Sequence, residues 1–226
     1  MLISVHIPKT GGSSFRTLLK NHFSNKLLLD YGDTPFNHHS FIRNTITITK
    51  MWSARSVEQQ CDCIHGHFLP IKYILLKEKT FTVWLREPVE MVVSLYYYIQ
   101  RNAETQQRKI NRYMGDVNIS LEDFCKIGHF HNIYAKYLWG MSLEQFSFVG
   151  ITENYAHSIE IFKKQHNIPS EGNLIVENVN PNKSTPIETY EVTHKLRQQI
   201  CDFNYKDIEI YRKALEINER LEQRYL

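Results

Sequence analysis

The feature that most constrains how this chain can fold is a glycine-containing loop, near its start, between an apolar strand and an amphipathic helix. Apolar and polar residues alternate over residues 2–7, a spacing typical of a strand. Pro8 and the pair Gly11-Gly12 interrupt this pattern, and apolar residues then recur at helical spacing from Phe15 to Phe23. The N-terminal residues therefore predict a strand, a tight loop and a helix.

A second unit of the same kind begins at Phe81. Residues 81–85 form a nearly continuous apolar run, which ends at Arg86, Glu87 and Pro88. Proline is favoured in the first turn of a helix, and apolar residues follow at helical spacing from there. Two strand-to-helix units predict an α/β fold in which a central parallel sheet is flanked by helices.

The remaining segments are interpreted from shorter patterns. Residues 27–51 are polar and irregular, and residues 101–113, rich in Arg, Gln and Asn, predict an exposed helix end or a loop that lines a substrate cleft. The other expected elements are a strand within 57–68 that ends at His65-Gly66-His67, a buried strand over 146–151, a strand and loop over 175–184, and two helices over 189–226.

Length and composition bound the class of protein. A chain of 226 residues with 42% apolar content can bury one sizeable core, so we expect a single domain over 1–226. A net charge of +3 gives no overall field that favours nucleic acid or an anionic membrane. The cysteines are too few for a disulfide framework, and no apolar run has the length of a leader or a membrane span. These features indicate a cytoplasmic protein, and they leave its oligomeric state open.

The loop near the N-terminus has the chemistry of an anion site. It lies where a strand hands over to a helix, so amide N–H groups and the positive end of the helix dipole point at a ligand. Glycines let the backbone approach an anion closely, and hydroxyl and ammonium groups supply further donors. The residues that we expect to bind the anion are Lys9, Thr10, Gly11, Gly12, Ser13 and Ser14.

The competing interpretation of such a loop is a nucleoside-triphosphatase P-loop. That pattern requires a lysine directly after its last glycine, followed by serine or threonine. Here Lys9 precedes both glycines, and the chain contains no Gly-Lys-Ser or Gly-Lys-Thr. The order of residues therefore disfavours a triphosphate site.

The string His-Ile-Pro-Lys-Thr-Gly-Gly-Ser-Ser at 6–14 resembles the 5'-phosphosulfate loop of carbohydrate sulfotransferases, in particular the heparan and uronyl 2-O-sulfotransferase type. The resemblance implies a P-loop-like sulfotransferase fold. It also implies that the donor is 3'-phosphoadenosine 5'-phosphosulfate and that the acceptor is a sugar hydroxyl. No metal is expected, because lysine and amide groups can meet the modest charge of a sulfuryl group.

A second anchor for the donor follows the second strand. Arg86 and Pro88 resemble the family's Arg-x-Pro element, with Ser94 on the helix that follows, and the resemblance assigns Arg86 and Ser94 to the donor's 3'-phosphate. An arginine at a strand end can form paired hydrogen bonds with a phosphate, and a serine two helical turns later can reach the same ligand. Without the first loop, an exposed arginine and a helix-surface serine would explain this pattern equally well.

Further matches extend along the chain. Residues 132–140 and 148–153 resemble two later family elements, as do Asp207 and Tyr211, although Lys136 stands where the family usually has arginine. Lysine keeps the charge but loses the planar fork. Lys183 and Ser184 occupy the position of a loop that closes over the donor in the family, so we include both as phosphate contacts.

The transfer requires a base, and histidine titrates near neutral pH. His65-Gly66-His67 resembles the His-Gly-His string of the 2-O-sulfotransferases, which implies that His67 is the base and His65 its helper. A zinc site made of Cys61, Cys63, His65 and His67 is disfavoured, because four alternate residues on a strand span about 20 Å. His6, His38, His39, His129 and His131 match no motif and are interpreted as structural.

The sequence thus predicts a sulfotransferase that acts on a hydroxyl acceptor, a glycan sugar by resemblance. Two other classes stay open. One is a nucleotide kinase or triphosphatase-like enzyme, and the other is a non-catalytic module that binds a nucleotide or a glycan. Acceptor pockets are built from variable loops, so no motif identifies the acceptor.

Overall fold

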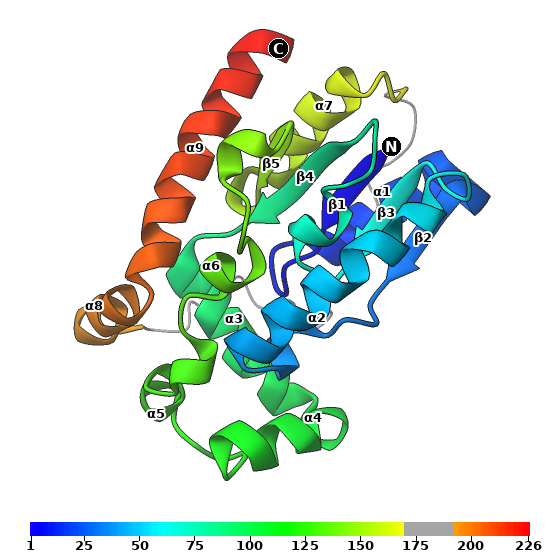
Figure 1. The fold of residues 1–226 in the computed structure, drawn as a ribbon. Coiled ribbons are helices and arrows are strands. Elements are labelled where there is room, and N and C mark those ends of the chain that lie inside the picture. Colours follow the sequence, from blue (N-terminus) through cyan, green and yellow to red (C-terminus); the bar gives the residue numbers. More distant parts are fainter. Residues whose placement is uncertain (170–191) are drawn as a thin grey trace.

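The computed structural model describes residues 1–169 and 192–226, and within these ranges the chain forms a five-stranded, fully parallel sheet with helices on both faces (Figure 1). The strands lie in the order β2-β3-β1-β4-β5. Their bounds are β1 Leu2–Val5, β2 Leu27–Asp30, β3 Cys63–Gly66, β4 Thr80–Leu85 and β5 Phe148–Ile151.

The helices connect these strands and cover the sheet. Their bounds are α1 Gly12–Phe23, α2 Ser40–Ser53, α3 Pro88–Arg101, α4 Ala103–Lys109, a π-helical turn Ile110–Met114, α5 Leu121–Cys125, α6 Ile133–Tyr137, α7 Tyr155–Gln165, α8 His194–Phe203 and α9 Tyr205–Tyr225. Short 3₁₀ turns lie between them, among them Pro35–Asn37, Pro70–Tyr73 and Thr152–Asn154. None of the described helices is long and apolar enough to cross a membrane.

The inner strands β1 and β4 are buried on both faces, which is why their sequences are apolar runs. Alternate residues of β1 face opposite sides of the sheet: Leu2 packs with Phe15 of α1 and Phe162 of α7, whereas Ile3 packs in the larger core on the other face. That larger core also takes in buried residues of α3, α6 and α9.

The helices α1 and α3 begin shortly after β1 and β4, and their first residues favour a helix start at these positions. The side chain of Glu87 accepts a hydrogen bond from the Glu90 N–H (2.8 Å), and Pro88 occupies the first position of α3. At the start of α1, Gly11 has a φ of 83°, a conformation that favours glycine.

The strand order determines where a ligand can bind. The chain runs from β1 to β2 and β3 on one side of the sheet, and then continues on the other side with β4 and β5. In open parallel sheets, ligands bind outside the carboxyl ends of the strands at the point where the order reverses. Here that point lies between β1 and β4, directly beside the loop at Lys9.

Most of the elements expected from the sequence are confirmed. They include the strands that end near Ile7, His67, Leu85 and Ile151. The helices after Ile7 (α1) and after Leu85 (α3) and the two C-terminal helices are also confirmed. The interpretation of 27–51 as irregular is wrong, because this stretch contains β2 and α2. Residues 101–113 are mostly helical and largely exposed, with Ile110 buried, so the exposed helix is confirmed and the open loop is not. The strand expected over 175–184 lies outside the described residues.

A network of buried charges stabilises the edge of the sheet formed by β2. The Lys72 ammonium donates to Asp30, at the end of β2 (2.6 Å), and to Asp33 (2.7 Å). Asp33 also accepts from Lys50 of α2 (2.6 Å), and the Tyr73 hydroxyl donates to Asp30 (2.8 Å). The lysine at the centre therefore neutralises two carboxylates and ties α2 to the sheet.

We predict that Lys72→Ala lowers the free energy of unfolding by about 3–5 kcal/mol, because it leaves Asp30 and Asp33 with less compensation for their buried charge. Lys77→Ala, at an exposed position nearby, serves as the matched control and should change stability by less than about 0.5 kcal/mol. Urea denaturation measures both. Equal stability of the two variants would show that the ion pairs contribute nothing.

Candidate functional site

The loop after β1 has a backbone shaped for close approach. Lys9 has a φ of 68° and Gly11 a φ of 83°, both in the left-handed region. The Thr10 hydroxyl donates to the Ile7 carbonyl (2.9 Å), which closes the loop on itself. A Cβ on Gly12 would lie 2.0 Å from the His6 ring, so only glycine fits between this ring and the start of α1.

Residues from the end of β5 fasten this loop. The Thr152 hydroxyl lies 2.9 Å from both the Thr10 and the Leu85 carbonyl oxygens, so it bridges the loop and the end of β4. The Tyr155 ring packs against Gly11, and its hydroxyl interacts with Ser14. The anion loop is therefore held on the side of β4 and β5 by contacts that the sequence motif alone does not reveal.

Two cations, Arg101 and Arg86, lie near the side chain of Lys9. Its ammonium lies over the Tyr98 ring of α3, 4.5 Å from the centroid. Burial, followed by the charges of Arg101 and Arg86, lowers the pKa of Lys9 to about 8. Mutual repulsion among these groups disfavours the site without a ligand, and an anion would relieve it.

Arg86 follows β4 and is oriented by its neighbours. Its guanidinium lies 3.7 Å from Glu90 and 3.9 Å from Glu153, and its carbonyl accepts a hydrogen bond from the Tyr134 hydroxyl (2.6 Å). Ser94 lies one helical turn before Tyr98, on the face of α3 that contacts the Lys9 side chain. Arg86, just before α3, and Ser94, within it, therefore both border the loop.

His65 is buried in the sheet beside α1. Its side chain is 1% exposed, and its Nδ1 lies 2.8 Å from the Ser4 hydroxyl. Its Nε2 has no hydrogen-bond partner among the described residues. Burial, together with the charges of His67 and Arg16, lowers the pKa of His65 to about 3, so this imidazole stays neutral.

His67 follows the end of β3 and faces the loop after β1. Its Nδ1 lies 2.5 Å from the His6 carbonyl oxygen. A carbonyl can only accept, so Nδ1 carries the proton and the neutral ring has its lone pair on Nε2. The His6 ring packs on His65 and His67, with centroids 5.0 and 4.5 Å away, and Tyr31 packs edge-on against His67 (4.8 Å). His6 therefore belongs to this cluster, although the sequence assigned it only a structural role.

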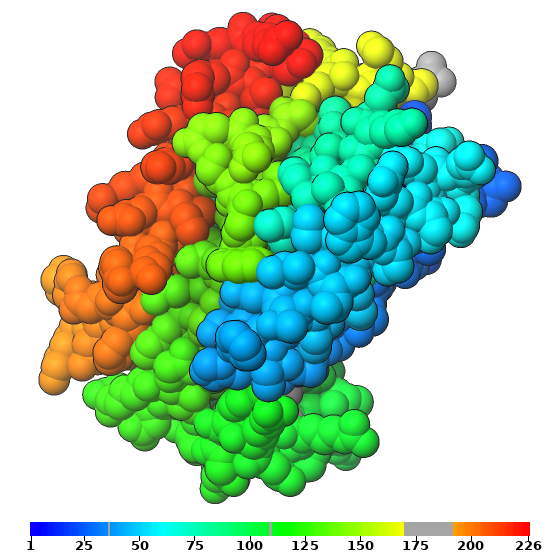
Figure 2. All heavy atoms as spheres, viewed as in Figure 1, coloured from blue at the N-terminus to red at the C-terminus, as the bar shows by residue number. Residues whose placement is uncertain are grey.

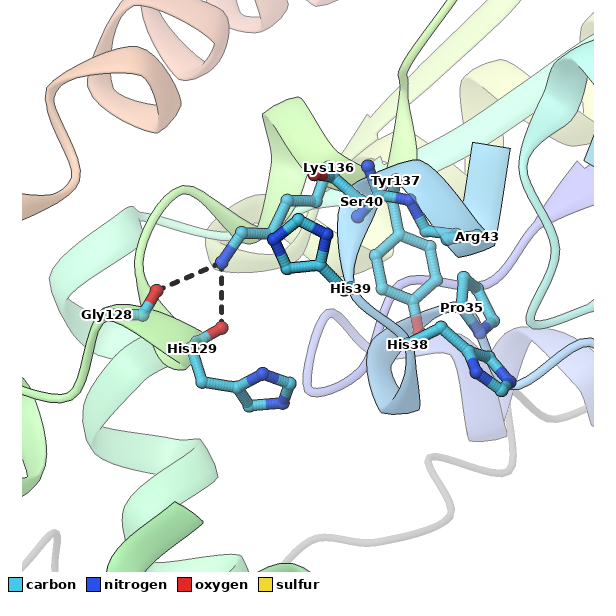
Figure 3. Close-up of a pocket in the computed structure, with 9 residues that line it drawn as sticks. All are labelled: Pro35, His38, His39, Ser40, Arg43, Gly128, His129, Lys136 and Tyr137. Atoms are coloured by element: carbon cyan, nitrogen blue, oxygen red, sulfur yellow. Dashed lines mark hydrogen bonds between the residues drawn. The ribbon is translucent and has the colours of Figure 1, made fainter. Parts of the chain in front are cut away.

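A pocket of about 390 Å³ opens next to this cluster (Figure 3). Tyr137 lines it, and the Tyr137 ring lies edge-on to His67 with centroids 6.3 Å apart. The lining residues are Pro35, His38, His39, Ser40, Arg43, Gly128, His129, Lys136 and Tyr137. They come from the start of α2 and from the region around α6, which are far apart in the sequence.

The pocket is basic, and no acidic residue is among those that line it. Arg43 is 6% exposed, and burial lowers the pKa of its guanidinium. The Lys136 ammonium donates to the carbonyls of His129 (2.8 Å) and Gly128 (3.2 Å), the dashed lines in Figure 3. Burial lowers the pKa of Lys136 to about 8, partly offset by Asp207. Such a lining suits an anionic ligand.

Asp207 and Tyr211 of α9 hold two parts of the site in place, the start of α6 and Glu153. Asp207 is fully buried and accepts from the Tyr134 and Ala135 amides, both 3.0 Å away, at the start of α6. Burial raises its pKa to about 6. The Tyr211 hydroxyl donates to Glu153 (2.8 Å), which in turn faces Arg86. These contacts position the pocket wall and Arg86.

The structure places most of the site residues expected from the sequence near the carboxyl ends of the parallel strands. They are Lys9, Thr10, Gly11, Gly12, Ser13, Ser14, His65, His67, Arg86 and Ser94. Lys183 and Ser184 lie outside the described residues. Within residues 1–169 and 192–226, no group of three or more His, Cys, Asp or Glu side chains is arranged to hold a metal ion. The residues that sequence reasoning missed are His6, Tyr31, Tyr98, Arg101 and the basic pocket lining.

Comparison with known proteins adds no family: no model of a protein family matches the chain, and no curated protein matches it in sequence. The likeness to carbohydrate sulfotransferases therefore depends on the motifs themselves and on what their geometry can do.

We predict that affinity for an anionic nucleotide such as 3',5'-bisphosphoadenosine falls above pH 8, by up to about tenfold per pH unit. Lys9 has a depressed pKa, so it is charged below pH 8 and loses its proton as the pH rises through 8. Lys9→Arg keeps its charge and should bind with little pH dependence from pH 7.5 to 9.5. Calorimetric titration at each pH measures this.

The matched control is Lys20→Arg, an exposed lysine at the other end of α1, which should keep the wild-type pH dependence. If Lys9→Arg and the wild-type chain lose affinity in parallel, Lys9 is not the group that binds the anion.

Proposed function

We propose that this protein is a sulfotransferase with a P-loop-like sulfotransferase fold, which moves a sulfuryl group from 3'-phosphoadenosine 5'-phosphosulfate to a hydroxyl. The observation that carries the proposal is one juxtaposition. An anion loop with Lys9 and a histidine whose lone pair is on Nε2 follow neighbouring strands, β1 and β3, at one edge of the sheet.

The donor would bind along the loop and α3. The amides at the start of α1 suit the 5'-phosphate, as at other helix N-termini, and Lys9 supplies the charge. Arg86 and Ser94, on the far side of Lys9, suit the 3'-phosphate. The positive charge of Arg101 favours the same polyanionic ligand. A nucleotide with phosphate at both ends accounts for all of these groups, whereas a single phosphate would leave Arg86 and Arg101 unexplained.

The chemistry follows an in-line displacement. The acceptor oxygen forms a bond to sulfur while the bond from sulfur to the bridging phosphate oxygen breaks, and the electron pair of that bond stays on the leaving 3',5'-bisphosphoadenosine. Lys9 and the loop amides stabilise the charge that develops on this oxygen. The hydroxyl proton moves to Nε2 of His67, and neutral His65 supports the cluster from within the sheet.

The acceptor would enter through the basic pocket. Tyr137 joins this pocket to His67, so a hydroxyl held there lies on the side of the base. Arg43, Lys136 and the histidines of the lining suit a carboxylate or a sulfate ester on the acceptor. An acidic sugar of a glycan combines such a group with free hydroxyls.

Two alternatives predict different binding. A nucleotide kinase or triphosphatase-like enzyme would prefer ATP with a divalent metal to 3',5'-bisphosphoadenosine. A non-catalytic nucleotide- or glycan-binding module would bind the donor but transfer nothing. The order of Lys9 and the glycines disfavours the first. The fixed tautomer of His67 favours an enzyme over the second, because a binding module needs no base.

We predict that His67→Ala lowers sulfuryl transfer by about 10²–10⁴-fold and leaves the affinity for 3',5'-bisphosphoadenosine within about threefold of the wild type, since a base acts on the acceptor alone. Transfer is measured with labelled donor and a panel of acidic and neutral glycans, with a metal chelator present. His22→Ala, at an exposed histidine of α1, is the control and should transfer normally.

Three outcomes would overturn the proposal or part of it. No binding of 3',5'-bisphosphoadenosine by the wild-type chain excludes the donor. Binding without transfer to any acceptor favours the non-catalytic module. Loss of both transfer and donor binding in His67→Ala gives this residue a structural role.

We also predict that Arg43→Gln raises the KM for an acidic acceptor by about tenfold and leaves kcat and donor affinity nearly unchanged, because it removes a charge that recognises the acceptor. Arg220→Gln, at an exposed arginine of α9, is the matched control. A fall in kcat at unchanged KM would place Arg43 outside the acceptor site.

A further inference from the structure

The helix α2 packs against the protein with its polar face and exposes its apolar face to solvent. On a helix of 3.6 residues per turn, Phe41, Ile48 and Trp52 form one stripe, and this stripe faces solvent. Their side chains are 76%, 49% and 71% exposed, and Ile42 beside them is 51% exposed. Figure 2 shows α2, in lighter blue, on the molecular surface at the front of the view.

The opposite face of α2 explains why the helix adopts this orientation. Arg43 and Thr47 are buried there, and Lys50 reaches Asp33 within the ion-pair network below. The helix packs on the turn Pro70–Tyr73, which carries Lys72. Polar contacts therefore fix the helix, and its apolar stripe is left for a ligand of another kind.

The charges around the stripe indicate an anionic partner. Residues 35–57 contain no Asp or Glu, although the net charge of the whole chain is only +3. Arg55 follows α2 and is exposed. Arg112, also exposed, donates to the Asn37 carbonyl (3.4 Å) just before α2, and Arg108 is exposed one turn earlier. Basic groups thus flank both ends of the stripe.

A second copy of this chain fits the stripe less well. Pairing two identical faces would bring these arginines together without an acidic partner from either α2. Phe and Trp side chains beside basic residues are instead typical of helices that lie in the interface of an anionic bilayer.

We propose that the exposed face of α2, formed by Phe41, Ile42, Ile48 and Trp52, docks on the surface of a membrane that contains anionic lipids. The helix would lie in the headgroup region, with its apolar stripe inserted and the arginines near lipid phosphates.

Docking would bring the basic pocket to the membrane. His39 and Ser40, directly before Phe41, line that pocket, so its mouth adjoins the docking face. This orientation rests on the proposed function of the pocket, whereas docking itself does not. A hydroxyl on a lipid headgroup would then be presented at the mouth of the pocket.

Vesicle binding tests the proposal without donor or acceptor. We expect the full chain to co-sediment with vesicles of phosphatidylcholine and phosphatidylglycerol, and less with phosphatidylcholine alone. Trp52 reports the contact directly in a Trp139→Phe variant, because the remaining tryptophan, Trp84, is 2% exposed. The fluorescence of Trp52 should shift to the blue and be quenched by brominated lipid.

Phe41→Ser with Trp52→Ser should weaken vesicle binding at least tenfold, and Arg55→Gln with Arg112→Gln should weaken it only for anionic vesicles. Leu215→Ser, at another exposed apolar residue on α9, is the matched control and should bind normally. Circular dichroism checks that each variant is folded.

Three results would overturn docking: equal binding of the Phe41/Trp52 variant and the Leu215 variant, no blue shift with either lipid, or a dimer in sedimentation that the Phe41/Trp52 substitutions dissolve. The last would assign the face to a second copy. Docking without transfer would leave this proposal standing while the sulfotransferase proposal fails, and transfer to soluble glycans without docking would do the reverse.

Discussion

The Thr152 hydroxyl ties the loop that follows β1 to the neighbouring strand ends of the sheet. It bridges the loop after β1 and the end of β4, and β5 carries it to that point. Parallel strands place their carboxyl ends on one edge, but the distances between those ends depend on such cross-links. Because Thr152 fixes the loop against β4, Lys9 and Arg86 can face one another despite their like charge. At the end of β3, His67 contacts the other side of the same loop through its hydrogen bond to the His6 carbonyl.

The positive charges have a second effect on the site. Burial comes first, but neighbouring cations also lower the pKa of the buried histidines: Arg16 acts on both His6 and His65, and Lys9 acts on His6. The field that attracts an anion therefore also keeps these imidazoles neutral. When an anion neutralises that field, the affinity of the cluster for a proton rises. Binding of an anionic ligand and proton uptake by the histidines are thus coupled through charges that lie in one loop and one helix.

The sequence predicted those parts of the fold in which local pattern and tertiary role agree. β1 and β4 are buried on both faces and are followed by strong turn or helix-start signals, so their apolar runs were informative. β2 is at the sheet edge with Leu28 and Leu29 exposed, and α2 buries Arg43 while exposing Trp52. Hydrophobic periodicity assumes that apolar residues face the core, and both elements violate that assumption.

The same reasoning explains which site residues were missed. Lys9 and His67 lie in short motifs, whereas Tyr98 and Arg101 approach Lys9 only because α3 packs beside the loop. The basic pocket joins Arg43 to Lys136 across many intervening residues. Local pattern carries no information about such contacts, since they are made by the packing of whole elements.

The reversed orientation of α2 follows from the charges beneath it. If its apolar stripe faced inward, it would cover Asp33 and Lys72 with hydrocarbon, and Lys50 would lose its carboxylate partner. Lys50 reaches Asp33 only with the polar face of α2 inward, and apolar side chains in its place could not offset the buried charges of Asp33 and Lys72. The network at the edge of the sheet thus selects the outward orientation, and the exposed stripe is a consequence of it. A surface selected in this way stays apolar whether or not anything covers it. Its first residue, Phe41, directly follows His39 and Ser40, which line the pocket.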